Sequence, residues 1–201
     1  HANAFTDSLD LNRLTNNDML GMVAAQLELN GREQLVSANG ILTRIEVKGY
    51  DYRNVTIDAV YHPTNIAGKI LVDDNNLMAN VEASYNATNA AQHIRLTGDI
   101  GKISPQALHL SDYWGSSSFS AIIDADLTAS SIADVQGTND LDDFTMVDRD
   151  TTRLTLDNLH LRSGYDGDRH FIRMTSDFGE ARLSGQFDLA TLPYSFATLL
   201  E

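Results

Sequence analysis

The sequence contains no cysteine, and this absence removes several kinds of chemistry at once. A chain without thiols has no disulfide framework, no thiolate nucleophile and no cysteine-ligated metal site. The sequence also lacks any run of 18 or more apolar residues, and no charged segment followed by an apolar one opens it. We therefore expect neither a membrane-spanning helix nor a signal peptide within these residues.

Basic residues are scarce. The chain has 14 Lys and Arg against 28 Asp and Glu, which gives a formal net charge of −14. Such a field repels phosphate backbones, so we expect no nucleic-acid partner. It also opposes electrostatic docking onto anionic lipid headgroups, but it leaves contact with acyl chains open. Simple solubility is the plainest role of this charge.

Sequence motifs of catalysis are missing as well. No G-x-S-x-G, G-x-x-x-x-G-K, G-x-G-x-x-G or H-E-x-x-H pattern occurs. The doublets Asp73-Asp74 and Asp142-Asp143 lack the rest of a calcium loop and are predicted to be solvated turn carboxylates. The histidines are too widely spaced to share a metal and are predicted to lie on the surface or to fill strands: His62, His93, His109, His160 and His170. The sequence therefore predicts a non-enzymatic protein without a cofactor or metal.

The sequence is instead rich in period-two alternation of apolar and polar residues. Residues 55–61, 66–72 and 77–85 each place apolar side chains in one phase, and short polar turns separate them. Consecutive strands joined by short turns form a meander of antiparallel pairs. The same pattern recurs at 36–47, 94–100, 119–127, 154–161 and 181–189, without a fixed period.

We therefore predict an all-β chain with ten to twelve strands in a single β domain that spans residues 1–201. Strands about 4.8 Å apart would make a sheet about 60 Å wide, which is too wide to stay flat. We expect a long antiparallel sheet folded over lengthwise, an open and barrel-like trough with one or two short helices. A well-packed sandwich, in which small residues face large ones, is the alternative.

Short helices are expected between the strands. Ser104 with Pro105 predicts a helix over Gln106–Leu110, and Ser131 predicts a cap for Ile132–Val135. Within residues 4–30, Leu11, Leu14 and residues 18–25 also fit a helix. Residues 196–200 fit either a terminal helix after Pro193 or the frayed end of the sheet. The aspartates between Gly137 and Asp150 predict an acidic loop.

The sequences of the predicted strands resemble those of the TamB family of translocation and assembly module proteins, in the form found in Bacteroidetes-like relatives. The likeness covers most of residues 30–200. It consists of short segments that are typical of the fold rather than motifs of a functional site. The similar segments are Asn39–Ile41, Lys48–Val55, Gly68–Ile70 with Asp73-Asp74, Ser104–Leu110, Leu156–Leu159, Ser176–Phe178, Ala181–Asp188 and Thr191–Pro193.

The resemblance implies a fragment of a larger envelope-spanning protein, similar to AsmA-like and bridge-like lipid-transfer proteins. Such a protein is anchored in the inner membrane by parts outside this sequence and crosses the periplasm. Its sheet folds into a "β-taco" whose apolar trough carries the acyl chains of phospholipids towards the outer membrane. An older view gives the family a role in assembling outer-membrane β-barrel proteins with a partner, TamA.

From the phase of the alternation, we predict which side chains line the trough of this non-enzymatic conduit. They are Ile57, Ala59, Tyr61, Ile70, Val72, Val81, Ala83, Ile123, Ala125, Leu127, Leu183 and Phe187. Two alternative functions remain. One is a scaffold that pairs its sheet edges with nascent barrel strands during outer-membrane protein assembly or secretion. The other is a secreted carbohydrate-binding β-sandwich that uses Trp114, Tyr113 and Asp112.

Overall fold

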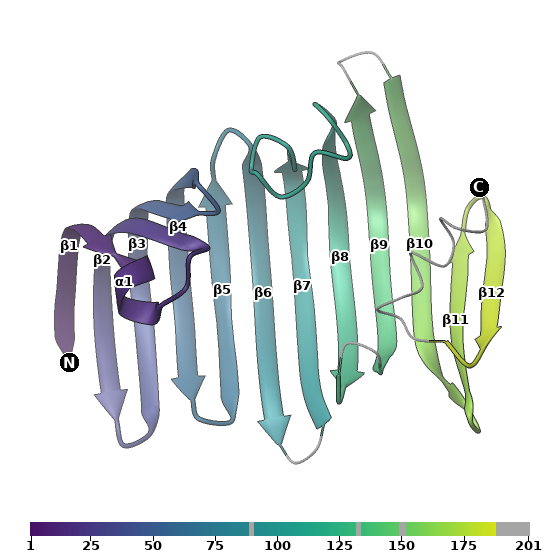
Figure 1. Ribbon diagram of the computed structural model, residues 1–201, viewed down its shortest axis with the longest axis horizontal. Coiled ribbons are helices and arrows are strands. Elements are labelled where there is room, and N and C mark those ends of the chain that lie inside the picture. The colour runs from purple at the N-terminus through teal and green to yellow at the C-terminus, as the bar shows by residue number, and fades with distance from the viewer. Residues whose placement is uncertain (89–90, 132–133, 149–151, 188–201) are drawn as a thin grey trace.

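The computed structural model describes residues 1–88, 91–131, 134–148 and 152–187. In these residues twelve strands form one antiparallel sheet in chain order, and the sheet is not closed into a barrel (Figure 1). The predicted all-β fold on one long open sheet is therefore confirmed. The elements are β1 (Ala2–Asp10), α1 (Leu11–Thr15), β2 (Leu20–Arg32), β3 (Leu35–Val47), β4 (Tyr50–His62), β5 (Asn65–Asp73), β6 (Leu77–Thr88), β7 (Ala91–Ile103), β8 (Ser118–Ala129), β9 (Val135–Asp148), β10 (Thr152–Asp166), β11 (Arg169–Ser176) and β12 (Gly179–Gly185).

Tight turns connect several of the strands, and local sequence explains their geometry. Lys48 and Gly49 join β3 to β4, and both have positive φ angles of 52° and 76°. Two consecutive residues with positive φ are typical of a type I′ turn, whose twist matches that of the strands that it joins. This hairpin therefore favours pairing of strands that follow each other in the sequence.

The sheet has one face that is mainly apolar and one that is mainly polar. Residues paired directly across neighbouring strands point to the same face, so the register assigns each side chain. We call the first the apolar face; one of its cross-strand rows contains Leu27, Gly40, Ile57, Ile70, Val81, Gly98, Ile123, Leu141 and Leu159. The polar face carries side chains such as Asp58 opposite Lys69 and Arg95 opposite Asp126.

Register shifts keep apolar residues on the apolar face where strict alternation fails. Leu42 and Ile45 of β3 are three positions apart, yet they pair with Ala25 and Val23, which are two apart on β2. One extra residue in β3 is accommodated there as a bulge, which bends the strand and resets its phase. This bulge explains why the sequence pattern is broken between residues 42 and 45.

The predicted helices differ from the structure. Gln106–Leu110 forms hydrogen-bonded turns rather than a helix, because Leu108 N donates to Ser104 O at 3.1 Å but Leu110 N reaches back to Pro105 O at 2.8 Å. The helical prediction is confirmed for Leu11 and Leu14, which lie in α1, and it is wrong for residues 20–25, which belong to β2. The only helix in the described residues is α1, where the Asp10 side chain caps Arg13 N at 3.2 Å.

The predicted acidic loop from Gly137 to Asp150 is also wrong, because β9 runs to Asp148. Asp140 and Asp142 occupy polar-face positions, where Asp140 pairs with Asp124 and with His160. Of the helix predicted over Ile132–Val135, residues 132 and 133 lie outside the described residues, whereas Val135 begins β9. The terminal helix predicted over 196–200 also lies outside them.

Within the described residues, no helix has both the length and the hydrophobicity that a bilayer crossing requires.

Candidate functional site

The register places the predicted lining residues on the apolar face, with the exception of Phe187. Ile57, Ile70, Val81 and Ile123 belong to a single cross-strand row, and the rows on either side of it hold the others. Phe187 follows β12, and its ring stacks on that of His170 with the centroids 4.9 Å apart. The remaining predicted residues of the apolar face are Ala59, Tyr61, Val72, Ala83, Ala125, Leu127 and Leu183.

One margin of the apolar face is covered. The cross-strand row on the side of the apolar face nearer the β3–β4 turn is buried. This row contains Ala25, Leu42, Val55, Val72 and Ala79. Leu11 of α1 packs against this cluster. Leu108, in the connection between β7 and β8, is fully buried. The helix and this connection therefore supply a partial second layer, which sequence periodicity in the strands does not reveal.

The connection between β7 and β8, residues 104–117, is fixed at both ends. The ring of His109 lies within hydrogen-bond distance of the Lys48 carbonyl, with Nδ1 and O 3.1 Å apart. At the other end the Trp114 ring packs edge-on against Phe119 of β8, with the centroids 5.2 Å apart. Ser117 Oγ donates to Asp148 Oδ1 at 3.3 Å. The segment is thus bound to the sheet from β3 to β9.

A hydrogen-bonded cluster of Tyr50, Asp74 and Asn76 lies at the same margin. Tyr50 Oη donates to Asp74 Oδ1 at 2.5 Å, and Asn76 Nδ2 donates to Tyr50 Oη at 3.1 Å. Asn76 N donates to Asp74 Oδ1 at 2.9 Å, so the buried carboxylate has two partners. Burial and the neighbouring Asp74 raise the pKa of the Tyr50 hydroxyl. This cluster connects the start of β4 to the β5–β6 turn.

The opposite margin of the apolar face is open to solvent. Tyr61, Ile66 and Ile94 lie in one cross-strand row there, and each is exposed. In the central row, Ile70 keeps 46% of its surface accessible. Substantial contacts between elements in the described residues join sequence neighbours, so no second sheet covers this strip. Exposed apolar surface of this extent is typical of a binding surface.

An apolar pocket lies at the β1 end of the sheet, next to the covered margin of the apolar face. It has a volume of about 540 Å³ and lies between β1, α1 and the covered end of β2 and β3. Leu9, Leu11, Val23, Leu27 and Leu42 line it. Strand periodicity does not predict this pocket, because the pocket depends on where α1 folds back over the sheet.

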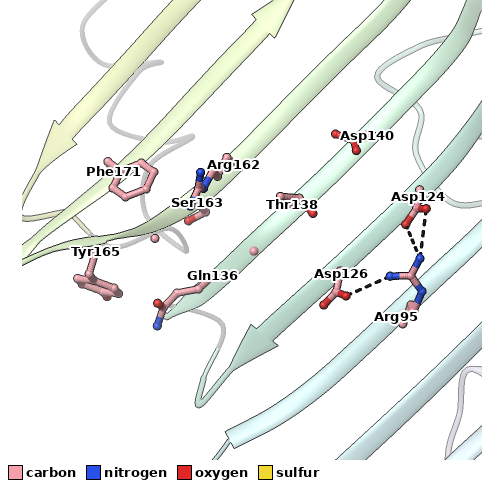
Figure 2. A pocket seen from close by; sticks show the side chains of 12 residues that line it. Arg95, Asp124, Asp126, Gln136, Thr138, Asp140, Arg162, Ser163, Tyr165 and Phe171 are labelled. Atoms are coloured by element: carbon pink, nitrogen blue, oxygen red, sulfur yellow. Dashed lines mark hydrogen bonds and ion pairs between the residues drawn. The ribbon is translucent and has the colours of Figure 1, made fainter.

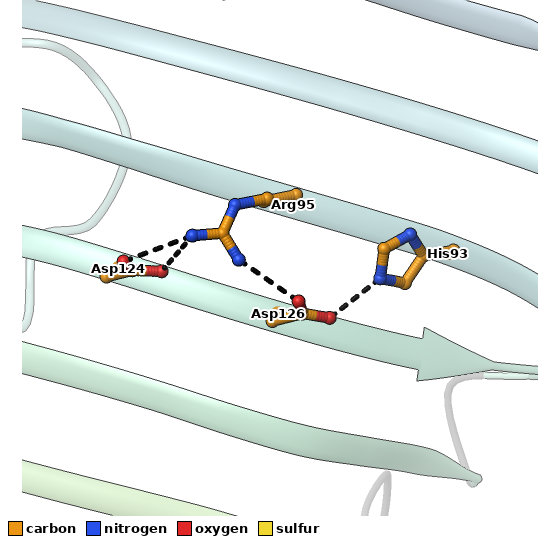
Figure 3. Close-up of polar contacts among 4 residues, drawn as sticks. All are labelled: His93, Arg95, Asp124 and Asp126. Carbon is orange, nitrogen blue, oxygen red and sulfur yellow. Dashed lines mark hydrogen bonds and ion pairs between the residues drawn. The ribbon is translucent and has the colours of Figure 1, made fainter.

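The polar face contains a compact ion-pair network on β7 and β8 (Figure 3). Arg95 binds Asp126 at 3.0 Å and Asp124 at 3.3 Å, and His93 Nε2 lies 2.7 Å from Asp126 Oδ1. The hydrogen bond with His93, together with Arg95, lowers the pKa of Asp126. The charge of Arg95 is therefore neutralised within the protein.

A hollow of about 660 Å³ crosses β7–β11 beside this network (Figure 2). Asp126, Thr138, Asp140 and Arg162 are among the residues that line it. Asp140 Oδ1 lies 2.9 Å from His160 Nδ1, so it too has a partner. Nothing in this arrangement presents a nucleophile next to a general base.

Ser163 and His170 form a contact that superficially suggests such a pair. Ser163 Oγ lies 2.7 Å from the Val135 carbonyl, to which it donates, and 2.8 Å from His170 Nε2. A hydroxyl has one proton, so His170 must donate through Nε2, the reverse of what a general base does. His170 is 2% exposed and stacks between Tyr165 and Phe187. We interpret the pair as structural.

The residues considered for metal or sugar binding are placed separately. In the described part of the chain, no group of His, Asp and Glu has the geometry of a metal site. Tyr113 and Trp114 form an edge-on pair with centroids 4.9 Å apart, and Tyr113 is exposed. Trp114 also packs edge-on against Phe119, which ties the connection to the sheet.

The chain matches no protein-family model, no curated protein and no solved structure among those with which it was compared.

Proposed function

We propose that the chain is a non-enzymatic segment of a lipid conduit that carries phospholipid acyl chains along the apolar face. One observation carries the proposal: the apolar face extends from β2 to β8, with Gly40 and Gly98 as gaps in its central row, and the row through Tyr61, Ile66 and Ile94 is exposed. Soluble proteins rarely expose a contiguous strip of apolar side chains unless that strip binds a ligand or a partner.

The physical basis of transfer is hydrophobic burial. Each methylene removed from water contributes about 0.8 kcal/mol, so an acyl chain of about sixteen carbons gains at most about 13 kcal/mol. Because each row repeats similar apolar side chains from strand to strand, neighbouring positions of the chain have similar free energies. Small differences between positions permit sliding along the sheet without a chemical step.

The likeness to the TamB family supports the cellular setting of this proposal. The segment would belong to a larger protein anchored in the inner membrane, and its cargo would cross the periplasm towards the outer membrane. A TamA-like barrel assembly protein would be the outer-membrane partner.

Two adjacent residues provide a matched test. Ile70 on the apolar face and Leu71 on the polar face are exposed to nearly the same extent, 46% and 45%. We expect Ile70→Asp to lower binding of a fluorescent acyl-chain probe about tenfold or more, because a charged carboxylate opposes an apolar ligand. Leu71→Asp should bind as the unaltered protein does.

Mass spectrometry of lipids that co-purify with the two variants gives a second readout. Equal lipid content in Ile70→Asp and Leu71→Asp would contradict the conduit, provided that circular dichroism shows both variants folded.

Strand pairing with an outer-membrane protein is a second candidate function, and the open sheet favours it. In the described residues β1 has a strand neighbour on one side only, so its outer edge offers unpaired backbone groups. A proline in β1 should abolish capture of a nascent barrel strand and leave lipid binding unchanged. Capture by the proline variant at the original level would exclude pairing at this edge.

A further inference from the structure

The polar face is divided into zones of opposite charge. Asp124, Asp126 and Asp140 occupy β8 and β9. On the neighbouring strands β10, β11 and β12, Arg162, Arg173 and Arg182 pair directly with one another in one cross-strand row. We call this the arginine row. It concentrates positive charge in a chain whose formal net charge is −14.

The arginine row differs from Arg44 and Arg95, which both have carboxylate partners. Arg95 faces Asp126, and Arg44, which faces Arg53, is bound by Asp51 at 2.7 Å. Like charges directly opposite each other on a sheet are destabilising. Yet no residue of the arginine row has an ion-pair partner among the described residues. Its positive charge is therefore available to a ligand.

The surroundings of the row form a recess. A hollow of about 530 Å³ is lined by Arg173, Thr175, Glu180 and Arg182. The guanidinium carbon of Arg182 lies 5.8 Å from the centre of the Phe171 ring, a cation–π distance that helps to hold this side chain. Phe171 lies over Gly164, where a Cβ atom would come within 3.1 Å of its ring. Glu180 offsets part of the charge but leaves the row with an excess of guanidinium groups.

We propose that the arginine row binds an anion that carries a phosphoryl group. The planar guanidinium fork donates two parallel hydrogen bonds to phosphate oxygens, and several arginines together match a dianion. Inorganic phosphate and a phospholipid headgroup share this chemistry. The row lies on the polar face, so the site is distinct from the apolar surface proposed to hold acyl chains and does not depend on it.

Titration with three probes tests the proposal and separates the two sources of phosphate. The probes are sodium phosphate, vesicles of phosphatidylcholine, and the same vesicles containing phosphatidic acid. We expect saturable binding of phosphate, of the phosphatidic-acid vesicles, or of both, and none to phosphatidylcholine alone. Binding only to the vesicles with phosphatidic acid would assign the site to a lipid headgroup.

Matched substitutions locate the binding. Arg173→Gln should weaken binding about tenfold or more, because it removes charge-assisted hydrogen bonds. Arg95→Gln should leave the affinity within about twofold, since its guanidinium is already paired. Arg173→Gln should also raise the melting temperature, because it relieves like-charge repulsion. Arg162→Gln offers an independent variant at the end of the row.

The proposal is wrong if no probe binds. It is also wrong if Arg95→Gln weakens binding as much as Arg173→Gln and Arg162→Gln do, because the effect would then reflect net charge alone.

Discussion

Gly137 shows how a single residue is fixed by the close approach of two strands. It has a φ angle of 131°, and a Cβ atom at this position would run into the carbonyl oxygen of Asp126 on β8. We expect Gly137→Ala to lower the free energy of unfolding by about 2 kcal/mol or more, because the strained backbone has no room to relax. Denaturant unfolding measures this difference.

Gly31 is the matched control for that prediction. A Cβ atom there has no neighbour within 4 Å, so Gly31→Ala should change the stability by less than about 1 kcal/mol. Equal losses in the two variants would refute the steric explanation.

The carboxylate of Asp126 gives a pH-dependent prediction at the same scale. Its pKa is lowered in the folded protein, so its contribution to stability is present above the unfolded pKa of about 3.9 and is lost as the pH falls through the folded value. His93→Gln removes the first cause of this shift and should raise the pKa of Asp126.

Carboxyl NMR titration follows that pKa directly. His62→Gln, which alters a histidine bonded to Thr64, serves as the control and should leave it unchanged. An Asp126 pKa that is the same in all three proteins would disprove the role of His93.

Among the elements, the connection between β7 and β8 depends on one fully buried side chain. We expect Leu108→Ala to lower the free energy of unfolding by about 2–4 kcal/mol, because it leaves a cavity beneath the segment. Leu110, two residues later, is 43% exposed, and Leu110→Ala should cost less than about 1 kcal/mol. Thermal unfolding compares the two, and similar melting temperatures would show that the segment is not anchored by Leu108.

The strands were predictable to different degrees, for physical reasons. Residues 55–61 of β4 and the strands β5 and β6 alternate strictly, so the sequence alone predicts them. β9 was missed because Gly137 and Asn139 occupy apolar-face positions and give no hydrophobic signal, while aspartates fill the other face. The residues around Ser104 were taken for a helix because Pro105 and a serine cap are common to helices and turns.

At the scale of the whole molecule, the pattern predicted which face is apolar but not which part of it is open. Tyr61 and Val72 share the apolar face, yet Tyr61 is exposed and Val72 is buried. Val72 belongs to the buried cluster against which Leu11 of α1 packs, and that contact is a tertiary effect absent from the strand pattern. The arginine row was invisible for a similar reason, because its members are brought together only by the register of β10–β12.

The order of the strands has a consequence for how the chain folds. Because every strand in the described residues pairs with its neighbours in sequence, the connection 104–117 is the longest segment that must close before the sheet can grow. Hairpins can form locally and add one after another as the polypeptide emerges, so the contact order stays low despite the all-β architecture. Inserting or removing one hairpin would widen or narrow the sheet by two strands. The apolar residues of the remaining strands would still lie on one face and the polar residues on the other.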